Sequence, residues 1–503
     1  MDKTDRRPGV QIRRAAASSG HAEVGPGRRF RHDLRRGLGA ALLELQDCAG
    51  PSRYSDVVRW ACLHVTTYDF QCEGGRGWYL HQAATLTGQA DSILTDVIDA
   101  FARCRPDGWR FCYLSDILLQ FAMSGSAPAR RALWDGFHRL MKRYRRTVRR
   151  DGWWPSASIL EGLALDLVNL DGWDAAYTAM SDFGEALTLG PAEPQHPHWQ
   201  YFPDWFDSSV RERFGNDAVE VSLAGGASPA LLAYAEVAGV LRTKPWRGGP
   251  STPAPTVAAV QAVVEQARRG EASAGRVRSA SLRVAQRRNR VYAEQVASLG
   301  LEEPDPDLKA ALLWPFRTRP FPLPDDALMP LVDSDHDMLR HVVRSILGQR
   351  GADWKRAHAL GLLQQGDHVD EALDLLNASY RPEDERAVDA AIRRVSVRGD
   401  QWHSAFSGVI DLLEPDDRPV TTGILDHIYR ETLCSNCREY TLDLMRAKGI
   451  VSDRITQECH WDANERIRHL AAEIDRPPPH TDRLPGHHAS APSQPCGAAV
   501  GQR

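Results

Sequence analysis

Apolar residues recur along most of this chain at the three- and four-residue spacing of an α-helix. The clearest stripe lies between 339 and 347, and another begins at Leu34. Residues at i, i+3, i+4 and i+7 share one helix face, so each stripe predicts an amphipathic helix with one buried face. The two stripes are Leu339, Val342, Val343, Ile346 and Leu347, and Leu34, Leu38, Ala41, Leu42, Leu45 and Cys48.

The alternating pattern of β-strands is nearly absent, so we expect an all-α protein. Polar or Gly/Pro-containing turns divide the periodic stretches into units of two short helices, each unit about 35–45 residues long, which is the period of helical solenoids. An Asp-Gly-Trp triplet occurs at 107–109, 151–153 and 171–173, and this order of residues suits a helix start. The predicted fold is therefore an α-solenoid of stacked antiparallel helix pairs, similar to HEAT and armadillo repeats.

Breaks in the periodicity divide the chain into five parts. Both ends are rich in Gly, Ser, Pro and Arg or His without periodicity, which is typical of disordered segments. Two proline-rich stretches, 246–256 and 314–324, interrupt the helical pattern in the middle. The expected parts are a disordered leader (1–30), an N-terminal helical-repeat block (31–245), a linker with an Arg-rich helical segment (246–324), a C-terminal helical-repeat block (325–475) and a disordered tail (476–503).

Composition and charge narrow the class of protein. With 503 residues, of which 42% are hydrophobic and 25% charged, the chain can bury a sizeable core. The net charge of -4 gives no overall bias toward nucleic acid or membranes, and no apolar run approaches the ~18 residues of a membrane helix. Nine cysteines are an odd number and too sparse for a disulfide scaffold. We therefore expect a cytoplasmic protein without a membrane partner.

A group of cysteines near the C-terminal end is the strongest hint of chemistry. Cys434 and Cys437 form a C-x-x-C pair, and Cys459 and His460 follow further along the chain. Three thiolates and an imidazole can fill the tetrahedral shell of a structural zinc ion, although adjacent residues such as Cys459 and His460 converge poorly on one ion. Three interpretations stay open: cysteines packed between helices as small apolar groups, a zinc site and a redox pair. No other cofactor is expected.

Arginine clusters suggest a second candidate surface. A basic helix face could neutralise the phosphates of a nucleic acid. The chain contains very few lysines, however, and such an arginine bias often follows from GC-rich coding, so a solvated helix face is the favoured explanation of the clusters. The candidate nucleic-acid-binding residues are Arg143, Arg145, Arg146, Arg149 and Arg150, and a second basic cluster lies between 268 and 290.

Motifs of common enzymes are absent from the sequence. It contains no G-x-x-x-x-G-K-[ST], no G-x-S-x-G and no H-E-x-x-H, and no carboxylate pair stands out as a general acid and base. The pattern therefore favours a protein that is not an enzyme, without deciding the question.

Three stretches resemble a family of bacterial HEAT-repeat proteins of unknown function. They are 61–79 (ACLHVTTYDFQCEGGRGWY), 161–187 (EGLALDLVNLDGWDAAYTAMSDFGEAL) and 429–470, which contains CSNCR and ECHWD. The resemblance implies a curved α-solenoid and no reaction. Together with the periodicity it predicts a non-enzymatic scaffold whose concave surface binds a protein or peptide. The alternative is a nucleic-acid-binding HEAT-like protein, related to the recognition of DNA lesions, that uses the arginine-rich helix faces.

Overall fold

The computed structural model describes residues 26–474, except for 69–75, 107, 152–156, 190–203, 226–227, 244–255, 286–289, 367, 398–400, 416–417 and 419–421. All regular elements in this part of the chain are helices, and it contains no strand, which confirms the all-α prediction. The expected tail (476–503) lies outside the described residues. So does the expected leader (1–30), apart from its last five residues, which begin the first helix.

The helices before the gap at 244–255 form what we call the N-terminal arm. They are α1 (Pro26–Arg36), α2 (Gly39–Asp47), α3 (Ser55–Leu63), α4 (Arg76–Leu86), α5 (Ala90–Arg103), α6 (Trp109–Met123), α7 (Ala127–Asp151), α8 (Ala157–Asp171), α9 (Trp173–Leu187), α10 (Asp204–Phe214), α11 (Asn216–Gly225) and α12 (Pro229–Thr243).

The helices after that gap form the C-terminal arm. They are α13 (Val257–Arg268), α14 (Ala274–Ala285), α15 (Arg290–Glu302), α16 (Pro306–Leu313), α17 (Asp337–Leu347), α18 (Asp353–Gln365), α19 (Val369–Leu376), α20 (Glu385–Ile392), α21 (Trp402–Leu413), α22 (Thr422–Glu431), α23 (Ser435–Ala447), α24 (Asp453–Cys459) and α25 (Glu465–Ile474).

The two apolar stripes are buried as the periodicity predicts, but the first is divided between two helices. The stripe from Leu339 to Leu347 is the buried face of α17. The stripe from Leu34 is interrupted because α1 ends at Arg36 and Gly37 adopts a positive φ of 74°, a conformation that glycine enters at little cost. The chain turns there, and α2 continues the apolar face with Ala41, Leu42 and Leu45.

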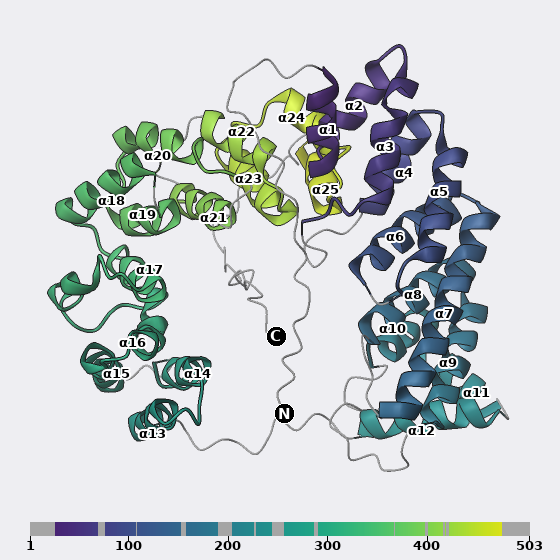
Figure 1. Cartoon of the computed structure of the whole chain (residues 1–503), viewed down its shortest axis with the longest axis horizontal. Coiled ribbons are helices and arrows are strands. Elements are labelled where there is room, and N and C mark those ends of the chain that lie inside the picture. The colour runs from purple at the N-terminus through teal and green to yellow at the C-terminus, as the bar shows by residue number, and fades with distance from the viewer. Residues whose placement is uncertain are drawn as a thin grey trace, which may run out of the picture.

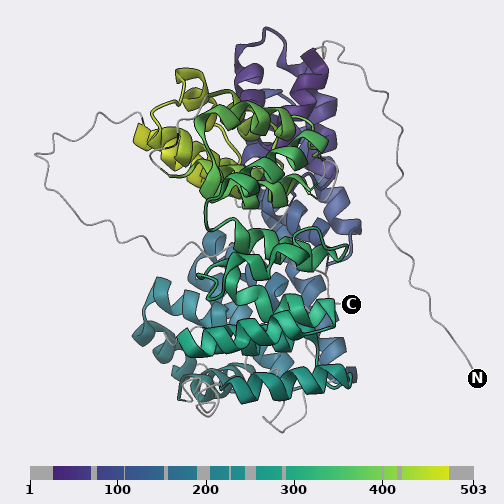
Figure 2. The same cartoon turned by 90° about the vertical axis from the view of Figure 1, so that its left-hand side faces the viewer.

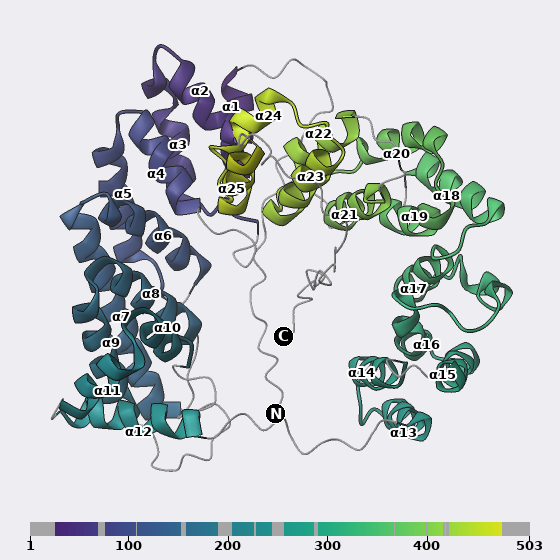
Figure 3. The same ribbon diagram turned by 180° about the vertical axis from the view of Figure 1, so that it is seen from behind.

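The helices stack in two rows that follow a wide arc (Figures 1 and 3). In each arm a helix packs against its sequence neighbours and also against the helix after next. Contacts between a helix and the helix after next connect α4, α6, α8 and α10 in order, and likewise α17, α19, α21, α23 and α25. We call α6, α8, α10, α14, α16, α17, α19, α21, α23 and α25, which lie on the concave side in both views, the inner row. The outer row includes α5, α7, α9, α18, α20 and α22.

The first and last helices of the chain pack together and join the two arms. Figure 2 shows the purple helices of the N-terminus beside the yellow helices of the C-terminus, and α2 contacts α24. The Ala463 backbone N–H donates to the Gly37 carbonyl oxygen at 2.9 Å. Ala463 packs into the core of the N-terminal arm, whereas Leu38 packs into the core of the C-terminal arm. Each core therefore takes residues from the other arm, and we call this contact the terminal junction.

The order of helices in space consequently differs from their order in the sequence. The array runs from α13 to α25, crosses the terminal junction to α1, and continues to α12. Its two open ends, α12 and α13, are neighbours in sequence, separated by residues 244–255. The expected linker and Arg-rich segment (246–324) contains α13 to α16, and these helices pack into the same core as α17 and the helices that follow. Among the described residues, no helix is both long and apolar enough to cross a membrane.

Replacing Gly39 by alanine is expected to destabilise the terminal junction. A Cβ atom at this position would lie 1.7 Å from the carbonyl oxygen of Glu458, so backbone must move to admit it. Such overpacking costs about 1–3 kcal/mol, and thermal unfolding should show a lower Tm. The matched control is Gly361→Ala in α18, where a Cβ meets nothing within 4 Å and alanine should be neutral or stabilising. Equal Tm values for the two variants would contradict the junction geometry.

Candidate functional site

The structure brings Cys434 and Cys437 together with a histidine from the preceding inner-row helix. His403 is the second residue of α21, and the two cysteines flank the first turn of α23. The ligand atoms of the three side chains all lie within 4.8 Å of one another. Both cysteines are buried and His403 is half-buried. We call these three residues the Cys–His cluster.

Local hydrogen bonds fix the two cysteines at the helix start. Cys434 precedes α23 in an extended conformation, and its N–H donates to Thr432 Oγ1 at 3.2 Å. Cys437 lies three residues later, so both side chains project from the same side of the first turn. The Thr441 hydroxyl donates to the carbonyl oxygen of Cys437 at 2.6 Å. Because α21 packs against α23, the imidazole of His403 reaches the same place.

The surroundings of Cys434 favour its thiolate form. A hydrogen bond from Cys437 has the largest effect, a second from His403 acts in the same direction, and together they lower the pKa of Cys434 to about 4 against the opposing effect of burial. Two aromatic rings border the imidazole: Trp402 lies edge-on at 5.5 Å, and Tyr68 of the N-terminal arm is stacked at 6.1 Å. A buried thiolate beside a thiol and an imidazole suits metal binding or thiol chemistry.

Cys459 and His460, the other two candidate metal ligands, are not part of this cluster. Cys459 ends α24, and its sulfur lies 3.4 Å from the hydroxyl of Tyr429. Burial raises the pKa of the Cys459 thiol to about 12, so this cysteine is a buried neutral group. The next residue, His460, is half-buried after the end of the helix. The four metal ligands expected from the sequence therefore lie in two places. Cys434 and Cys437 lie at the start of α23, whereas Cys459 and His460 lie at the end of α24, which belongs to a different helix pair.

His403 is the member of the cluster that the sequence did not reveal. It lies far upstream of the C-x-x-C pair, and no spacing rule connects them. The repeat could have done so, because His403 and the two cysteines occupy the same place, the start of the inner-row helix, in consecutive units. Aligning the units on their helix starts would have placed the imidazole beside the thiols.

The arginines proposed for nucleic-acid binding are partly engaged within the protein. Arg145 pairs with Asp182 and with Glu185, the latter at 2.8 Å. Arg143 is half-buried and Arg146 is exposed, whereas the side chains of Arg149 and Arg150 lie outside the described part of the structure. In the second basic cluster, Arg268 pairs with Glu265 and Glu303, Arg269 with Glu271, and Arg290 with Glu294. These ion pairs reduce the positive charge available to a phosphate backbone.

Carboxyl groups with raised pKa values recur on the inner row of both arms. They are Asp116 on α6, Asp166 on α8, Asp374 on α19, Asp411 on α21 and Asp443 on α23. Burial is the largest cause in every case, and it raises the pKa of Asp166 to about 7 and that of Asp374 to about 6. These five residues form what we call the carboxyl line.

In α19, α21 and α23 the residue of the carboxyl line lies on the least buried face of its helix, whereas the Asp116 carboxylate accepts a hydrogen bond from the N–H of Gly77 in α4 at 2.6 Å. In α19, Asp370 and Asp374 are the two residues that are not buried, and they stand one turn apart. Asp411 and Asp443 are likewise absent from the buried faces of α21 and α23. Because the other sides of an inner-row helix contact the outer row and the adjacent inner-row helices, the least buried face looks toward the concave side of the arc.

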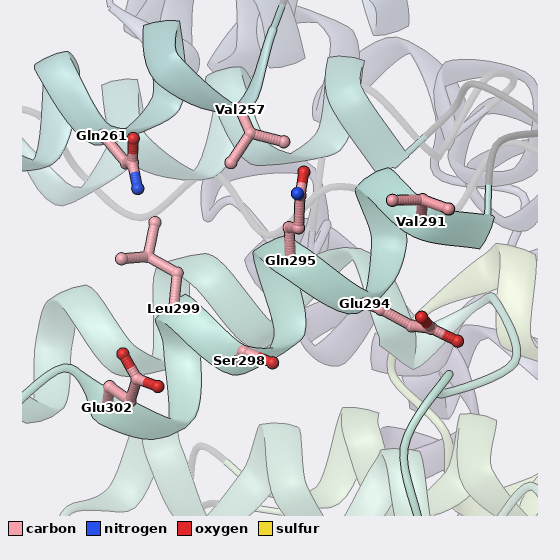
Figure 4. Close-up of a pocket in the computed structure, with 8 residues that line it drawn as sticks. All are labelled: Val257, Gln261, Val291, Glu294, Gln295, Ser298, Leu299 and Glu302. Carbon is pink, nitrogen blue, oxygen red and sulfur yellow. The ribbon is translucent and has the colours of Figure 1, made fainter.

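A shallow groove lies at one open end of the array, between α13 and α15 (Figure 4). Its volume is about 440 Å³. The lining residues are Val257, Gln261, Val291, Glu294, Gln295, Ser298, Leu299 and Glu302. Its polar side chains are Gln261, Glu294, Gln295, Ser298 and Glu302.

Comparison with known proteins adds no assignment: no family model matches the chain, and no curated protein or solved structure matches it.

Replacing Asp166 by asparagine should stabilise the protein at alkaline pH and have little effect in acid. An aspartate with a higher pKa in the folded protein than in the unfolded chain holds its proton more tightly when folded. Its contribution to stability is therefore present at low pH and is lost as the pH rises from about 3.8 to about 7. Thermal unfolding at pH 8 should give a higher Tm for Asp166→Asn than for wild type, and the difference should shrink at pH 5. A difference in Tm that does not depend on pH would contradict the raised pKa of Asp166. The control is Asp353→Asn, which removes a carboxylate at an exposed position.

Proposed function

We propose that this chain is a non-enzymatic scaffold, similar to HEAT and armadillo α-solenoids, that binds a protein or peptide segment along the concave side of its arc. The two rows of helices, each packed mainly on its neighbours, support this proposal, because stacked repeats create long concave surfaces of this kind. A cytoplasmic location and the resemblance to bacterial HEAT-repeat proteins belong to the same proposal.

The carboxyl line is the observation that carries the proposal furthest. It places acidic groups on α6 and α8 in one arm and on α19, α21 and α23 in the other, and in the second arm they lie on the least buried faces of their helices. A carboxylate that is partly desolvated gains more from an approaching cation than one in bulk water. The partner we propose is therefore a protein segment with basic side chains, bound by charge complementarity.

The same line disfavours nucleic acid on the concave side. Carboxylates repel a phosphate backbone, whose binding depends on neutralisation by Lys and Arg. Arg145, the best placed arginine of the alternative site, is already paired with Asp182 and Glu185. Binding of nucleic acid through the outer face of α7 remains the competing proposal, and one experiment separates the two.

The test is cross-linked affinity capture from cell extract, with and without nuclease treatment, and quantification by mass spectrometry. The informative variant is Asp411→Lys, which reverses an exposed charge on the inner row, and its matched control is Asp353→Lys, which makes the same change on α18 of the outer row. We expect proteins enriched by the wild type to fall about tenfold or more with Asp411→Lys and to persist with Asp353→Lys. Equal capture by both variants would contradict concave-side binding, and enrichment abolished by nuclease would favour the nucleic-acid alternative.

A further inference from the structure

We propose that His403, Cys434 and Cys437 bind one zinc ion, with the fourth coordination position left to water. This site is independent of the proposed partner, because it is formed entirely by α21, α23 and the residue before α23. It also replaces the ligand set that the sequence suggested, since Cys459 and His460 lie elsewhere.

The spacing of the three ligand atoms fits a single ion. Zinc lies about 2.3 Å from a cysteine sulfur and about 2.0–2.1 Å from a histidine nitrogen in a tetrahedral site. Ligand atoms around one zinc are consequently a little under 4 Å apart, and here all three lie within 4.8 Å of one another. The remaining difference is at most about 1 Å, which small rotations of the three side chains would close.

The chemistry of the ligands selects the metal. Thiolates and imidazole are soft to intermediate donors, which suit zinc far better than magnesium or calcium. The cysteines bind zinc as thiolates, any thiol proton that remains passes to solvent, and the imidazole binds through a neutral nitrogen. No carboxylate belongs to this cluster in the described residues, so a hard, oxygen-seeking cation would find no suitable donor there.

The surroundings orient the ligands in the way that metal sites require. Thr432 and Thr441 hold the backbone on either side of the cysteine pair. The rings of Tyr68 and Trp402 border the imidazole of His403 and limit its rotation. Supporting contacts of this kind matter for affinity, since their loss typically weakens metal binding about 10–100-fold.

The position of the site indicates what the ion does. It links the starts of two successive inner-row helices, α21 and α23, whose contact otherwise depends on apolar packing. Three protein ligands leave one position for a water molecule, and His403, which is half-buried, lies on the side nearest solvent. Zinc therefore fixes the start of α21 against the start of α23. Tyr68 of the N-terminal arm contacts Trp402 and His403 at the same place.

The test measures metal content directly. Full-length protein, reduced and equilibrated with excess ZnCl₂, is desalted and analysed by inductively coupled plasma mass spectrometry. We expect about one zinc ion per wild-type chain, with loss of zinc in His403→Ala and Cys437→Ser and retention in Cys459→Ser. Circular dichroism shows whether each variant is folded, and zinc removal should lower the Tm of the wild type.

A second measurement avoids variants altogether. Cobalt(II) in place of zinc should give wild-type protein the intense visible bands of a tetrahedral site and a thiolate-to-metal charge-transfer band in the near ultraviolet. Reduced wild-type protein that takes up neither metal would overturn the proposal, and so would equal loss of zinc in Cys459→Ser and Cys437→Ser. Formation of a Cys434–Cys437 disulfide in place of metal uptake would overturn it in favour of a redox pair.

Discussion

The backbone of α2 lies so close to the end of α24 that residue 39 has no room for a side chain, and the shape of the array depends on this contact. A buried ion pair lies beside it: Arg438 of α23 donates to both carboxylate oxygens of Asp462, at 2.8 and 3.0 Å, and neither side chain is exposed. Removing one partner of such a pair leaves an uncompensated buried charge and costs about 3–5 kcal/mol. This ion pair lies within the C-terminal arm, and the contacts that cross the terminal junction beside it are the close approach of Gly39 to Glu458, the Ala463–Gly37 backbone hydrogen bond and the Arg36–Glu431 ion pair at 3.0 Å. Together they make the terminal junction a specific contact.

The junction makes one curved surface from two separate stretches of sequence. Without it, the inner row would be divided into two short arms joined only through residues 244–255. With it, the carboxyl line continues from α19, α21 and α23 of one arm toward α6 and α8 of the other. The Cys–His cluster lies in the same region, and Tyr68 of the N-terminal arm stacks against His403 of the C-terminal arm. The proposed partner surface and the proposed zinc site thus both rely on the ends of the chain meeting.

Local features of the fold were predictable from the sequence, whereas contacts between distant segments were not. The apolar stripe at 339–347 follows from periodicity, which acts over a few residues. Helices also begin at Trp109 and Trp173 of the Asp-Gly-Trp triplets, but neither start has a side-chain cap hydrogen bond. The Cys434–Cys437 pair was recognisable because its spacing is equally local. The approach of His403, the contact between Gly39 and Glu458, and the alignment of Asp374 with Asp411 depend on which helices stack together. Spacing within one helix contains no information about that choice, so the sequence could only suggest Cys459 and His460 as ligands.

The central claim is that the two ends of the chain form the middle of one continuous array. It is tested most directly by inserting a protease site within residues 244–255, cleaving the folded protein there, and measuring the mass of the product by size-exclusion chromatography with light scattering. The account predicts that both fragments elute together with the mass of the intact chain, also at high salt, because buried packing of Leu38 and Ala463 and the Ala463–Gly37 backbone hydrogen bond join the two arms and are not screened by salt. Two fragments that separate after cleavage would contradict it.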